Sequence, residues 1–379
     1  MKIPFSKVFL GEEEIGAVTE TLRSGSIHGD GPIGKKVETK LKVLFGSKHA
    51  LLATSGTHAL EMALMALKIM PGDEVILPSF TFVSTANAVM LQGARPVFAE
   101  IDLETLNIDP RDIEKKITKK TKAIIPVHYG GIGCRMDEIM YLAKKNNIYV
   151  VEDAAQGVDA KYKGRYLGTI GDVGCYSFHE TKNITCGEGG ALMTDDDDVK
   201  RRAEIIREKG TNRSAFLRGE VDKYTWIDKG SSYVNSDILS AVLDVQLDRV
   251  KEITVRRRKI YDYYNEALKD LAEAERIYLP EIPPECEHNG HIFYFRLRTE
   301  KERYHYLAEL KKRGIGATFH YIPLHSSPYG REVLGYKAED LPVTELVSKT
   351  LIRLPLYPQM TDREIEYIVD NVRNVIGVL

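Results

Sequence analysis

A repeated alternation of short apolar runs and helix-like segments in the first 200 residues constrains the fold most strongly. The runs are HALLAT (49–54), EVILP (74–78), RPVFAEI (95–101), KAIIPVH (122–128), IYVVED (148–153), GCYSF (174–178) and GALMT (190–194). Between several of them apolar residues recur at helical spacing, as at Leu60, Leu64 and Leu67. Strand, helix and strand in repetition predict an α/β fold with a mostly parallel sheet covered by helices. The nearly continuous apolar runs fit strands that are buried on both faces.

The second half of the chain departs from this alternation. Residues 208–232 are polar and punctuated by glycine, which predicts a long loop, and such loops are commonly functional. A helical pattern then runs from Ser236 to about Leu271. The later elements that we expect are a strand at HIFYFRL (291–297), a helix from Lys301 to Arg313 and an amphipathic helix from Asp362 to Ile376. We expect residues 1–250 to form a large α/β domain and residues 251–379 a smaller C-terminal α/β domain.

Composition excludes several classes of partner. Charged residues nearly balance, with a formal net charge of -2, which gives no global attraction to nucleic acid or to an anionic membrane. The sequence contains no apolar run of about 20 residues and no signal-peptide pattern, so we expect no membrane span. The four cysteines form no CxxC pair, which argues against a cysteine-only metal site. Free thiols in a chain of this size suit the reducing cytoplasm.

The segment ATSGTHALEMAL (53–64) combines the features of a phosphate site. We expect a strand to end at Thr54 and a helix to begin at about Thr57, with Gly56 in the turn. A helix N-terminus offers unpaired backbone N–H groups and the positive end of the helix dipole. Glycine lets an anion approach the backbone closely. The segment therefore predicts phosphate binding, although ordinary helix capping by Ser or Thr produces the same pattern.

A second glycine-rich segment, HGDGPIG (28–34), fits the GxGxxG pattern of dinucleotide-binding loops. Such a site needs a strand before the glycines and a helix after them. The preceding residues, TLRSGS, are instead the end of a charged helix. We interpret the segment as an ordinary glycine-rich loop.

Two carboxylates lie at the end of one strand in VVEDAAQG (150–157). Glu152 and Asp153 end a run that is expected to be buried, and ligands of open α/β sheets bind beyond the carboxyl ends of the strands. A carboxylate there is placed to hold a protonated ring nitrogen, and Gln156 is near enough in sequence to share the site. Considered alone, the pattern favours Asp153 as the cap of a following helix.

The segment CYSFHETKNITCGEGGALMT (175–194) places a lysine between two apolar strands. Lys182 follows Ser177 by five residues and precedes a glycine-rich stretch, whereas most lysines are simply solvated. A lysine nucleophile must be partly deprotonated to attack an aldehyde, and dry or cationic surroundings favour that form. A phosphate site, an acid and a lysine, in this order, are the groups that pyridoxal phosphate (PLP) requires.

The chain resembles the sugar-nucleotide aminotransferases of PLP fold type I over nearly all of its length. The resemblance rests on the ordered series TSGTHAL, PSFTFVSTANAV, PVFAEID, PVHYGG, VEDAAQ, SFHETKN, GEGGA and HYIPLH. It implies a large, mostly parallel seven-stranded sheet domain with a smaller C-terminal α/β domain. It also implies a homodimer with the active site at the subunit interface, and pyridoxamine phosphate (PMP) as the second cofactor form.

The resemblance assigns roles around the cofactor ring. Lys182 would bind the cofactor covalently and then move the proton between substrate and cofactor. Asp153 would pair with the pyridinium nitrogen, and Gln156 would lie near the phenolic oxygen. Phe82 would stack on the ring, while ordinary core packing is the alternative for this residue.

The resemblance also assigns the phosphate site. Gly56 and Thr57 would bind phosphate through backbone amides, and Ser177 through its hydroxyl. Many relatives carry an Asn that reaches the phosphate of the partner subunit, and here GSSYVNSD (230–237) has Ser232 at that place. Serine can donate the same hydrogen bond but reaches less far.

The segment 206–226, followed by GSSY, is most similar to the transaminases that form dTDP-4-amino-4,6-dideoxygalactose. Those enzymes use L-glutamate and dTDP-4-dehydro-6-deoxy-D-glucose, and this similarity implies a role in cell-surface polysaccharide biosynthesis. The candidate substrate-binding residues are Arg213 and Arg218 for the pyrophosphate, with Tyr321 and His320 near the sugar. Solvated arginines, and structural roles for His320 and His325, are the alternatives.

Three other functions share the motifs. A PLP-dependent sugar dehydratase of the same fold would carry histidine in place of Lys182. An aminotransferase that acts at C3, or gives the other C4 epimer, is disfavoured only by the 206–235 segment. A non-catalytic sensor with the PLP fold would have no need of the intact Lys182, Asp153 and Gln156.

Overall fold

The central element is a seven-stranded sheet, seen in a computed structural model that describes residues 1–377. Its order is β1 (His49–Ala53), β9 (Gly190–Thr194), β8 (Val173–Ser177), β5 (Tyr149–Asp153), β4 (Thr121–Ile124), β2 (Glu74–Pro78) and β3 (Arg95–Ala99). Strand β9 runs antiparallel to both of its neighbours, and the other pairs are parallel. Each of the apolar runs in the sequence forms one of these strands, so the predicted α/β sheet is confirmed.

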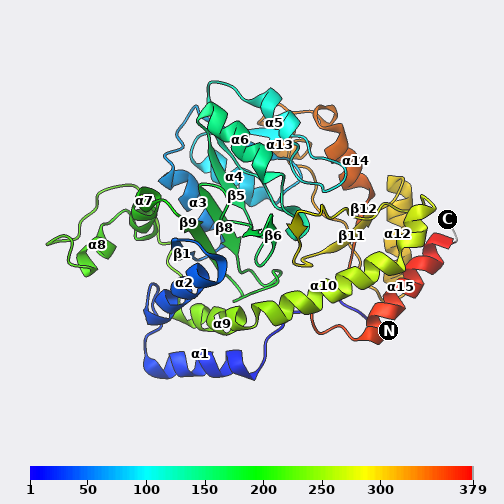
Figure 1. The fold of residues 1–379 in the computed structure, drawn as a ribbon, viewed down its shortest axis with the longest axis horizontal. Coiled ribbons are helices and arrows are strands. Elements are labelled where there is room, and N and C mark those ends of the chain that lie inside the picture. Colours follow the sequence, from blue (N-terminus) through cyan, green and yellow to red (C-terminus); the bar gives the residue numbers. More distant parts are fainter. Residues whose placement is uncertain (378–379) are drawn as a thin grey trace.

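Helices cover both faces of this sheet (Figure 1). One face packs against α2 (Pro32–Phe45), α5 (Pro110–Lys116), α6 (Met136–Asn146) and α9 (Asp237–Asp248). The other packs against α3 (Gly56–Ala66), α4 (Val83–Leu91) and α7 (Asp197–Arg207). Neighbouring residues of one strand face opposite layers, as with Leu52 in the first cluster and Leu51 in the second. Burial of both faces explains why the strands are apolar throughout.

The C-terminal part has its own core. A two-stranded antiparallel sheet packs with helices around a third apolar cluster, which also includes Ile3. The elements that contribute to this cluster are α10 (Val250–Ala267), β11 (Phe293–Arg296), α12 (Glu300–Lys312), β12 (Leu351–Leu354) and α15 (Asp362–Gly377). Helix α14 (Pro342–Thr350) belongs to a fourth apolar cluster, which includes Phe80 and Tyr129. Backbone hydrogen bonds join Ile3 to Gly314 and Gly316, so the first residues of the chain lie with this part (Figure 1). The expected division near residue 250 stays a proposal.

The remaining elements are short or peripheral. They are α1 (Glu12–Ser24), the 3₁₀ turn η1 (Tyr129–Gly131), β6 (Lys161–Tyr162), β7 (Arg165–Tyr166), α8 (Arg213–Leu217), α11 (Lys269–Glu273), β10 (Cys286–Glu287), α13 (Pro328–Glu332) and η2 (Ala338–Asp340). The short strands β10, β6 and β7 form a third sheet. Helix α8 lies on a segment that projects from the body of the molecule (Figure 1).

Two sequence predictions need correction. The pattern from Ser236 to about Leu271 is not one helix, because α9 ends at Asp248 and α10 (Val250–Ala267) begins after a break at Arg249. The Arg249 guanidinium packs over the Phe9 ring at 4.1 Å, which fixes the chain at the break. The loop predicted at 208–232 contains the short helix α8.

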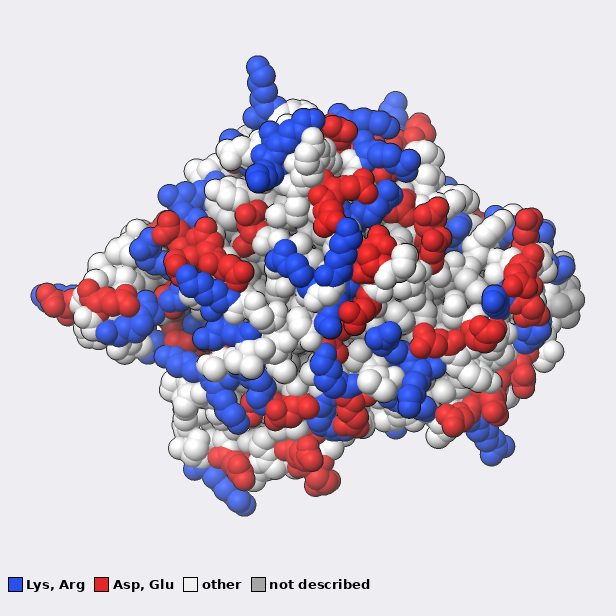
Figure 2. All heavy atoms as spheres, viewed as in Figure 1, with Lys and Arg blue, Asp and Glu red and all other residues white. Residues whose placement is uncertain are grey.

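Charge is distributed evenly over the visible surface. On the face in Figure 2, acidic and basic side chains are interspersed, as the balanced composition leads one to expect. No helix within residues 1–377 is long and apolar enough to cross a membrane.

Candidate active site

A cavity of about 560 Å³ lies beyond the carboxyl ends of β1, β2, β5 and β8. One wall comes from the turns that follow these strands, and the other from residues of the C-terminal part. The sequence-predicted residues that line it are Gly56, Thr57, Phe82, Asp153, Gln156, Ser177, Lys182, His320 and Tyr321. The fold therefore brings the three predicted segments together at one edge of the sheet.

Helix α3 begins at this edge, directly after β1. The Ser55 side chain caps it by accepting a hydrogen bond from the His58 N–H at 3.1 Å, and Gly56 opens the helix. A Cβ atom on Gly56 would lie 2.7 Å from the Ser177 Cβ, so only glycine lets the end of β8 approach this helix start. The first N–H groups of α3 and the Ser177 side chain thus face the cavity together, as an anion site requires.

Asp153 is held at the end of β5. Its Oδ2 accepts a hydrogen bond from the Thr85 hydroxyl at 2.8 Å, and its Oδ1 accepts one from the Ala155 N–H at 3.2 Å. No helix follows Asp153 before β6, so the interpretation of this residue as a helix cap is wrong. The carboxylate is buried at the cavity wall, where it is available to a protonated nitrogen.

The neighbouring Glu152 points into the protein. Its carboxylate accepts hydrogen bonds from the N–H groups of Gly168, Ile170 and Gly171, and from His128 Nε2 at 2.8 Å. Burial alone raises the pKa of Glu152, but these hydrogen bonds and the His128 charge outweigh burial and hold the pKa below its usual value. Glu152 therefore anchors the end of β5, which positions Asp153.

Lys182 lies in the turn between β8 and β9, with its side chain on the cavity wall. Burial lowers the pKa of its amine, and the nearby charge of Arg353 acts in the same direction, while Asp153 opposes them. A lowered pKa increases the fraction of neutral amine, which is the form that attacks an aldehyde.

Tyr321 and His320 form part of the opposite wall. The Tyr321 hydroxyl accepts a hydrogen bond from Gln156 Nε2 at 2.8 Å, and Gln156 Oε1 accepts one from the Gly130 N–H. The His320 ring stacks on the Tyr321 ring at 3.7 Å and hydrogen bonds to the Tyr129 hydroxyl through Nδ1 at 2.6 Å. Burial moves the pKa of His320 well below its usual value, and the pKa of Tyr321 above its own. Both side chains are therefore neutral at pH 7.

Phe82 and His325 have opposite surroundings. The Phe82 side chain is 58% exposed and lines the cavity, so ordinary core packing does not describe it. His325 is fully buried, and its Nδ1 lies 2.7 Å from the Ser79 hydroxyl. It does not line the cavity, which fits the structural alternative.

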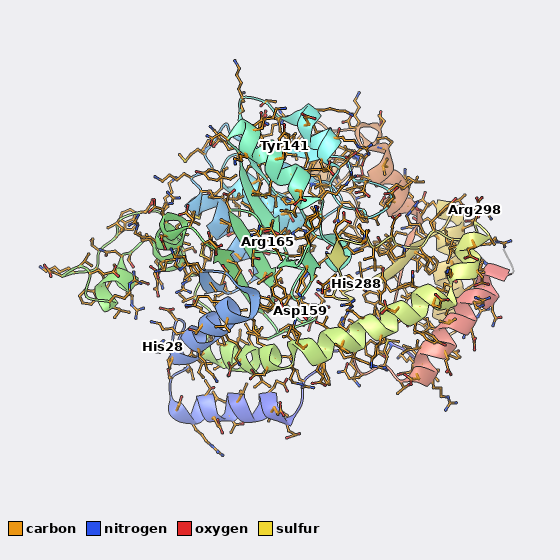
Figure 3. All side chains as sticks on the ribbon, in the orientation of Figure 1. His28, Tyr141, Asp159, Arg165, His288 and Arg298 are labelled. Carbon is orange, nitrogen blue, oxygen red and sulfur yellow. The ribbon has the colours of Figure 1, made fainter. Side chains whose placement is uncertain are left out.

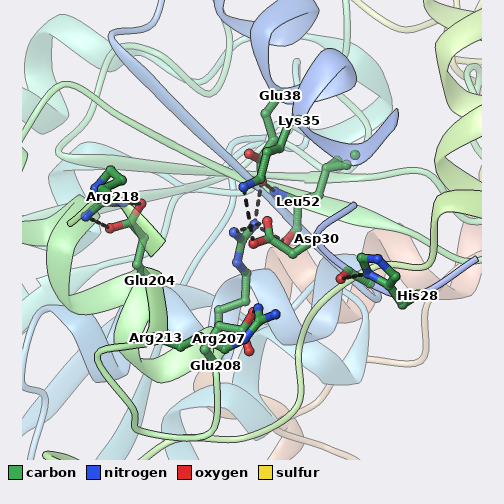
Figure 4. A network of polar contacts seen from close by, with 12 residues as sticks. His28, Asp30, Lys35, Glu38, Leu52, Glu204, Arg207, Glu208, Arg213 and Arg218 are labelled. Atoms are coloured by element: carbon green, nitrogen blue, oxygen red, sulfur yellow. Dashed lines mark hydrogen bonds and ion pairs between the residues drawn. The ribbon is translucent and has the colours of Figure 1, made fainter. Parts of the chain in front are cut away.

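Three predicted residues lie outside this cavity. Arg213 pairs with Glu208 at 3.1 Å, and Arg218 pairs with Glu204 at 3.0 Å (Figure 4). Ser232 is exposed on the same segment of chain. Within the described part of this one chain, none of the three reaches the cavity.

A buried ion-pair network anchors the base of this segment. Arg207 Nη2 donates to Asp30 at 2.8 Å, and its Nη1 bonds to Glu38 and to the Leu52 carbonyl (Figure 4). The nearby glycine-rich loop opens α2, whose first N–H groups are already occupied by the carboxylate of Asp237. The structure therefore confirms that 28–34 is not a dinucleotide site.

Several cavity residues were not predicted from the sequence. Thr85 orients Asp153, and His291 Nδ1 donates to the amide oxygen of Asn183 at 2.9 Å. Arg257 donates to the carbonyls of Gly290 and His291. His288, labelled in Figure 3, packs beside α10 against the Tyr261 ring at 4.3 Å. These contacts fix the 288–292 turn next to Lys182.

Arg353 is another cavity residue that was missed. It interrupts the apolar run LIRLPLY, and an unexplained charge in an apolar strand was the available signal.

The described residues fit PLP. An anion site at a helix N-terminus, a carboxylate at a strand end and an amine with a lowered pKa face one cavity of suitable size. Together with the seven-stranded sheet, this arrangement defines a PLP-dependent enzyme of fold type I.

Comparisons with known proteins agree with this class. A model of the DegT/DnrJ/EryC1/StrS aminotransferase family matches residues 9–373. The chain therefore belongs to this family, and it is an aminotransferase that uses PLP.

Two curated relatives match over nearly their whole length. The uncharacterized protein MJ1066 of Methanocaldococcus jannaschii is 40% identical over 99% of this chain and 98% of its own. The spore coat polysaccharide biosynthesis protein SpsC of Bacillus subtilis is 37% identical over 99% of this chain and 97% of its own. Among solved structures, the putative sugar aminotransferase Spr1654 of Streptococcus pneumoniae in its PLP form is 30% identical. It has a TM-score of 0.92 and covers 100% of this chain and 99% of its own, and a PMP form is known as well.

Proposed function

We propose that this sugar aminotransferase converts L-glutamate and dTDP-4-dehydro-6-deoxy-D-glucose into 2-oxoglutarate and dTDP-4-amino-4,6-dideoxy-D-galactose. The observation that carries transamination is that Lys182, Asp153 and the start of α3 face one cavity. The similarity of the 206–226 segment supports the sugar and the product. The name of SpsC supports a place in the biosynthesis of a cell-surface polysaccharide.

The chain's own residues define the steps that they perform. PLP, when bound, supplies an aldehyde and an electron-accepting ring. The N–H groups of Gly56 and Thr57 and the Ser177 hydroxyl would hold its phosphate. Asp153, fixed by Thr85, would keep a proton on the ring nitrogen.

Lys182 would act first as a general base and then, once protonated, as a general acid. Its lowered pKa suits removal of the α-proton of glutamate, and in the second half-reaction the protonated amine would deliver a proton to C4 of the sugar. The side from which Lys182 delivers this proton sets the C4 configuration. The neutral Tyr321 hydroxyl faces the same space and serves as a hydrogen-bond group for the sugar.

The projecting 208–232 segment supports a homodimer with a shared active site. Its apolar side chains are exposed, with Trp226 at 78% and Leu217 at 56%, which is unusual for a surface that meets only water. Ser232 and Arg213 lie on this segment, away from their own cavity. Pairing of two chains would bring them to the cavity of the partner.

The four cysteines within the described residues are free and buried, which supports the expected reducing cytoplasm.

The retained Lys182 disfavours a dehydratase or a sensor. The second candidate function is amination at C3, or at C4 with the opposite configuration, because the cavity residues named here serve those reactions equally well.

The test is to incubate the PLP-loaded protein with L-glutamate and dTDP-4-dehydro-6-deoxy-D-glucose and to read the product by NMR. An axial amine at C4 is the expected result. An equatorial amine would replace the product with its epimer. No amination, with formation of 2-oxoglutarate intact, would show that the sugar is wrong.

A further inference from the structure

Asn183 ties the turn that carries Lys182 to a distant part of the chain. Its Nδ2 donates to the Asn289 carbonyl at 3.1 Å, and its Oδ1 accepts a hydrogen bond from His291 Nδ1 at 2.9 Å. Within residues 178–189, all of which the structure describes, no other side chain hydrogen bonds to a distant segment. The turn between β8 and β9 therefore has one such tether, and it stands next to Lys182.

Asn289 continues this tether to the turn that follows β5. Its Nδ2 donates to the carbonyls of Gln156 and Val158 at 2.8 and 2.7 Å, and the residue is only 1% exposed. That turn begins directly after Asp153, where β5 ends. Hydrogen bonds of 2.7 to 3.1 Å therefore lead from the residue beside Lys182 to the turn beside Asp153.

The tether has one consistent arrangement of donors and acceptors. The Asn183 Nδ2 faces a carbonyl, which can only accept, so its Oδ1 faces the His291 ring. His291 Nδ1 must then carry a proton, and since burial moves the pKa of the ring well below its usual value, Nε2 is unprotonated at pH 7. The Asn289 Oδ1 also accepts the His291 N–H at 3.0 Å. Asn183, Asn289 and His291 are here called the amide clamp.

The far end of the amide clamp is anchored to α10. Arg257, on this helix, donates to the Gly290 carbonyl at 3.0 Å and to the His291 carbonyl at 2.6 Å. Gly290 has a φ of +61°, and a Cβ atom on it would lie 2.8 Å from the Arg257 carbonyl carbon, so glycine lets this turn approach the helix. The Lys182 turn is therefore tied to a fixed point.

Proton transfer by Lys182 requires accurate placement of its amine. Within residues 1–377 the side-chain amine makes no hydrogen bond, so its position depends on the backbone that carries it. Misplacement of a catalytic group by about 1 Å costs about 10²-fold in rate. Each member of the amide clamp is at most 8% exposed, and loss of one member leaves buried polar groups without partners. The clamp can therefore hold this backbone closely.

We propose that the amide clamp positions Lys182, by fixing the turn that carries its amine against the turn that follows Asp153. Asn183 and Asn289 are then positioning residues, which act through Lys182 and need not touch the substrate. This inference rests on the role of Lys182 in the proposed function. It adds the residues that keep the amine in dry surroundings and within reach of the substrate carbon.

The test follows the Lys182 amine in the full-length protein. Competitive acetylation at several pH values, read by mass spectrometry on protein without PLP, gives the pKa of Lys182. Single-turnover formation of 2-oxoglutarate by the PLP-loaded protein gives a rate constant and an apparent Kd for L-glutamate. Asn183→Ala is compared with Asn107→Ala, because Asn107 is equally buried and donates to the Ile132 and Gly133 carbonyls at 3.1 Å but does not hydrogen bond to the clamp.

We expect Asn183→Ala to raise the pKa of Lys182 toward its ordinary value, because water reaches the amine of a loosened turn, so that the neutral fraction falls about 10-fold. The rate constant should fall about 10-fold or more, with the apparent Kd for glutamate within about two-fold of wild type. Asn107→Ala should lower the Tm and leave the pKa of Lys182 and the kinetics unchanged. In the wild type, 15N NMR should show the Nδ1–H tautomer of His291, which tests the clamp even if Asn183→Ala does not fold.

An unchanged titration of Lys182 in Asn183→Ala would overturn the proposal. So would the Nε2–H tautomer of His291, because it requires the opposite orientation of the Asn183 amide. Equal shifts in Asn183→Ala and Asn107→Ala would overturn it as well, since they would reflect general loosening of the protein. If the wild type forms no 2-oxoglutarate but Asn183→Ala still shifts the titration of Lys182, the proposed function fails and the amide clamp stands.

Discussion

The two walls of the cavity are built in different ways. On the sheet side, Gly56, Asp153 and Ser177 each lie within three residues of a strand end, so the backbone of the sheet places them. On the C-terminal side, Tyr321 and Arg353 come from two segments that are far apart in the sequence. The segments meet where the Arg353 backbone pairs with Thr318 and where the Arg353 guanidinium donates to the Phe319 carbonyl. The groups of the sheet wall are therefore placed by strand ends, whereas those of the other wall depend on contacts between distant segments.

The largest effect should come from the sheet wall at Lys182. Lys182→Ala removes the residue that we propose as both the covalent attachment point and the general base, so we expect turnover to fall by about 10³-fold or more. Single-turnover kinetics and the visible absorption of the bound cofactor measure this. Lys163→Ala, in an exposed turn, is the matched control. A Lys182→Ala protein with near-normal turnover would remove Lys182 from the mechanism.

Asp153→Asn should be the next most damaging change. The amide keeps the size of the side chain and an acceptor for Thr85, but it cannot hold a proton on a ring nitrogen. We expect a loss of about 10²-fold in kcat with little change in Tm. Activity within a few-fold of wild type would show that Asp153 serves only the structure.

Glu152→Gln should lower the free energy of unfolding, whereas Asp153→Asn should mainly lower kcat. Loss of the buried charge weakens the hydrogen bonds from three N–H groups and His128, at a cost of about 2 kcal/mol in the free energy of unfolding. The folded-state pKa lies below the unfolded value of 4.5, so the carboxylate stabilises the protein above that pH. The difference between wild type and variant should therefore shrink as pH falls through the folded pKa, as urea unfolding at several pH values will show. A constant difference would contradict this account.

The two walls also differ in how far the sequence predicts them. Strand periodicity predicted the sheet, and thus the edge at which Gly56, Asp153 and Ser177 lie. The roles of Asp153, Lys182 and the phosphate site came from the resemblance to a known family, and they stay predictions. The partners that orient these groups were not predictable, because Thr85 lies in an ordinary helical pattern and contacts Asp153 only through tertiary packing. For the same reason, the break at Arg249 left no signal in a continuous helical pattern.

A smaller effect is expected at the close contact between the start of α3 and the end of β8. Gly56→Ala places a Cβ 2.7 Å from that of Ser177, so the start of α3 and the end of β8 must separate. Overpacking of this kind costs about 1–3 kcal/mol, and we expect cofactor affinity to fall about 10-fold or more. Gly16→Ala is the control, because its Cβ meets nothing within 4 Å in the middle of α1, and it should slightly stabilise the protein. Equal cofactor affinity in both variants would place the phosphate elsewhere.

The smallest effect should come from the C-terminal wall. Tyr321→Phe removes the hydroxyl that accepts the Gln156 amide at 2.8 Å but keeps the ring that stacks on His320. Loss of one neutral hydrogen bond costs about 1 kcal/mol, so we expect a several-fold rise in KM for the sugar nucleotide. The rate of the glutamate half-reaction should stay within two-fold of wild type, because the cofactor groups on the sheet wall are untouched. If that half-reaction slows as much as the sugar half-reaction, Tyr321 acts on the cofactor through Gln156, and the functional separation of the two walls fails at this residue.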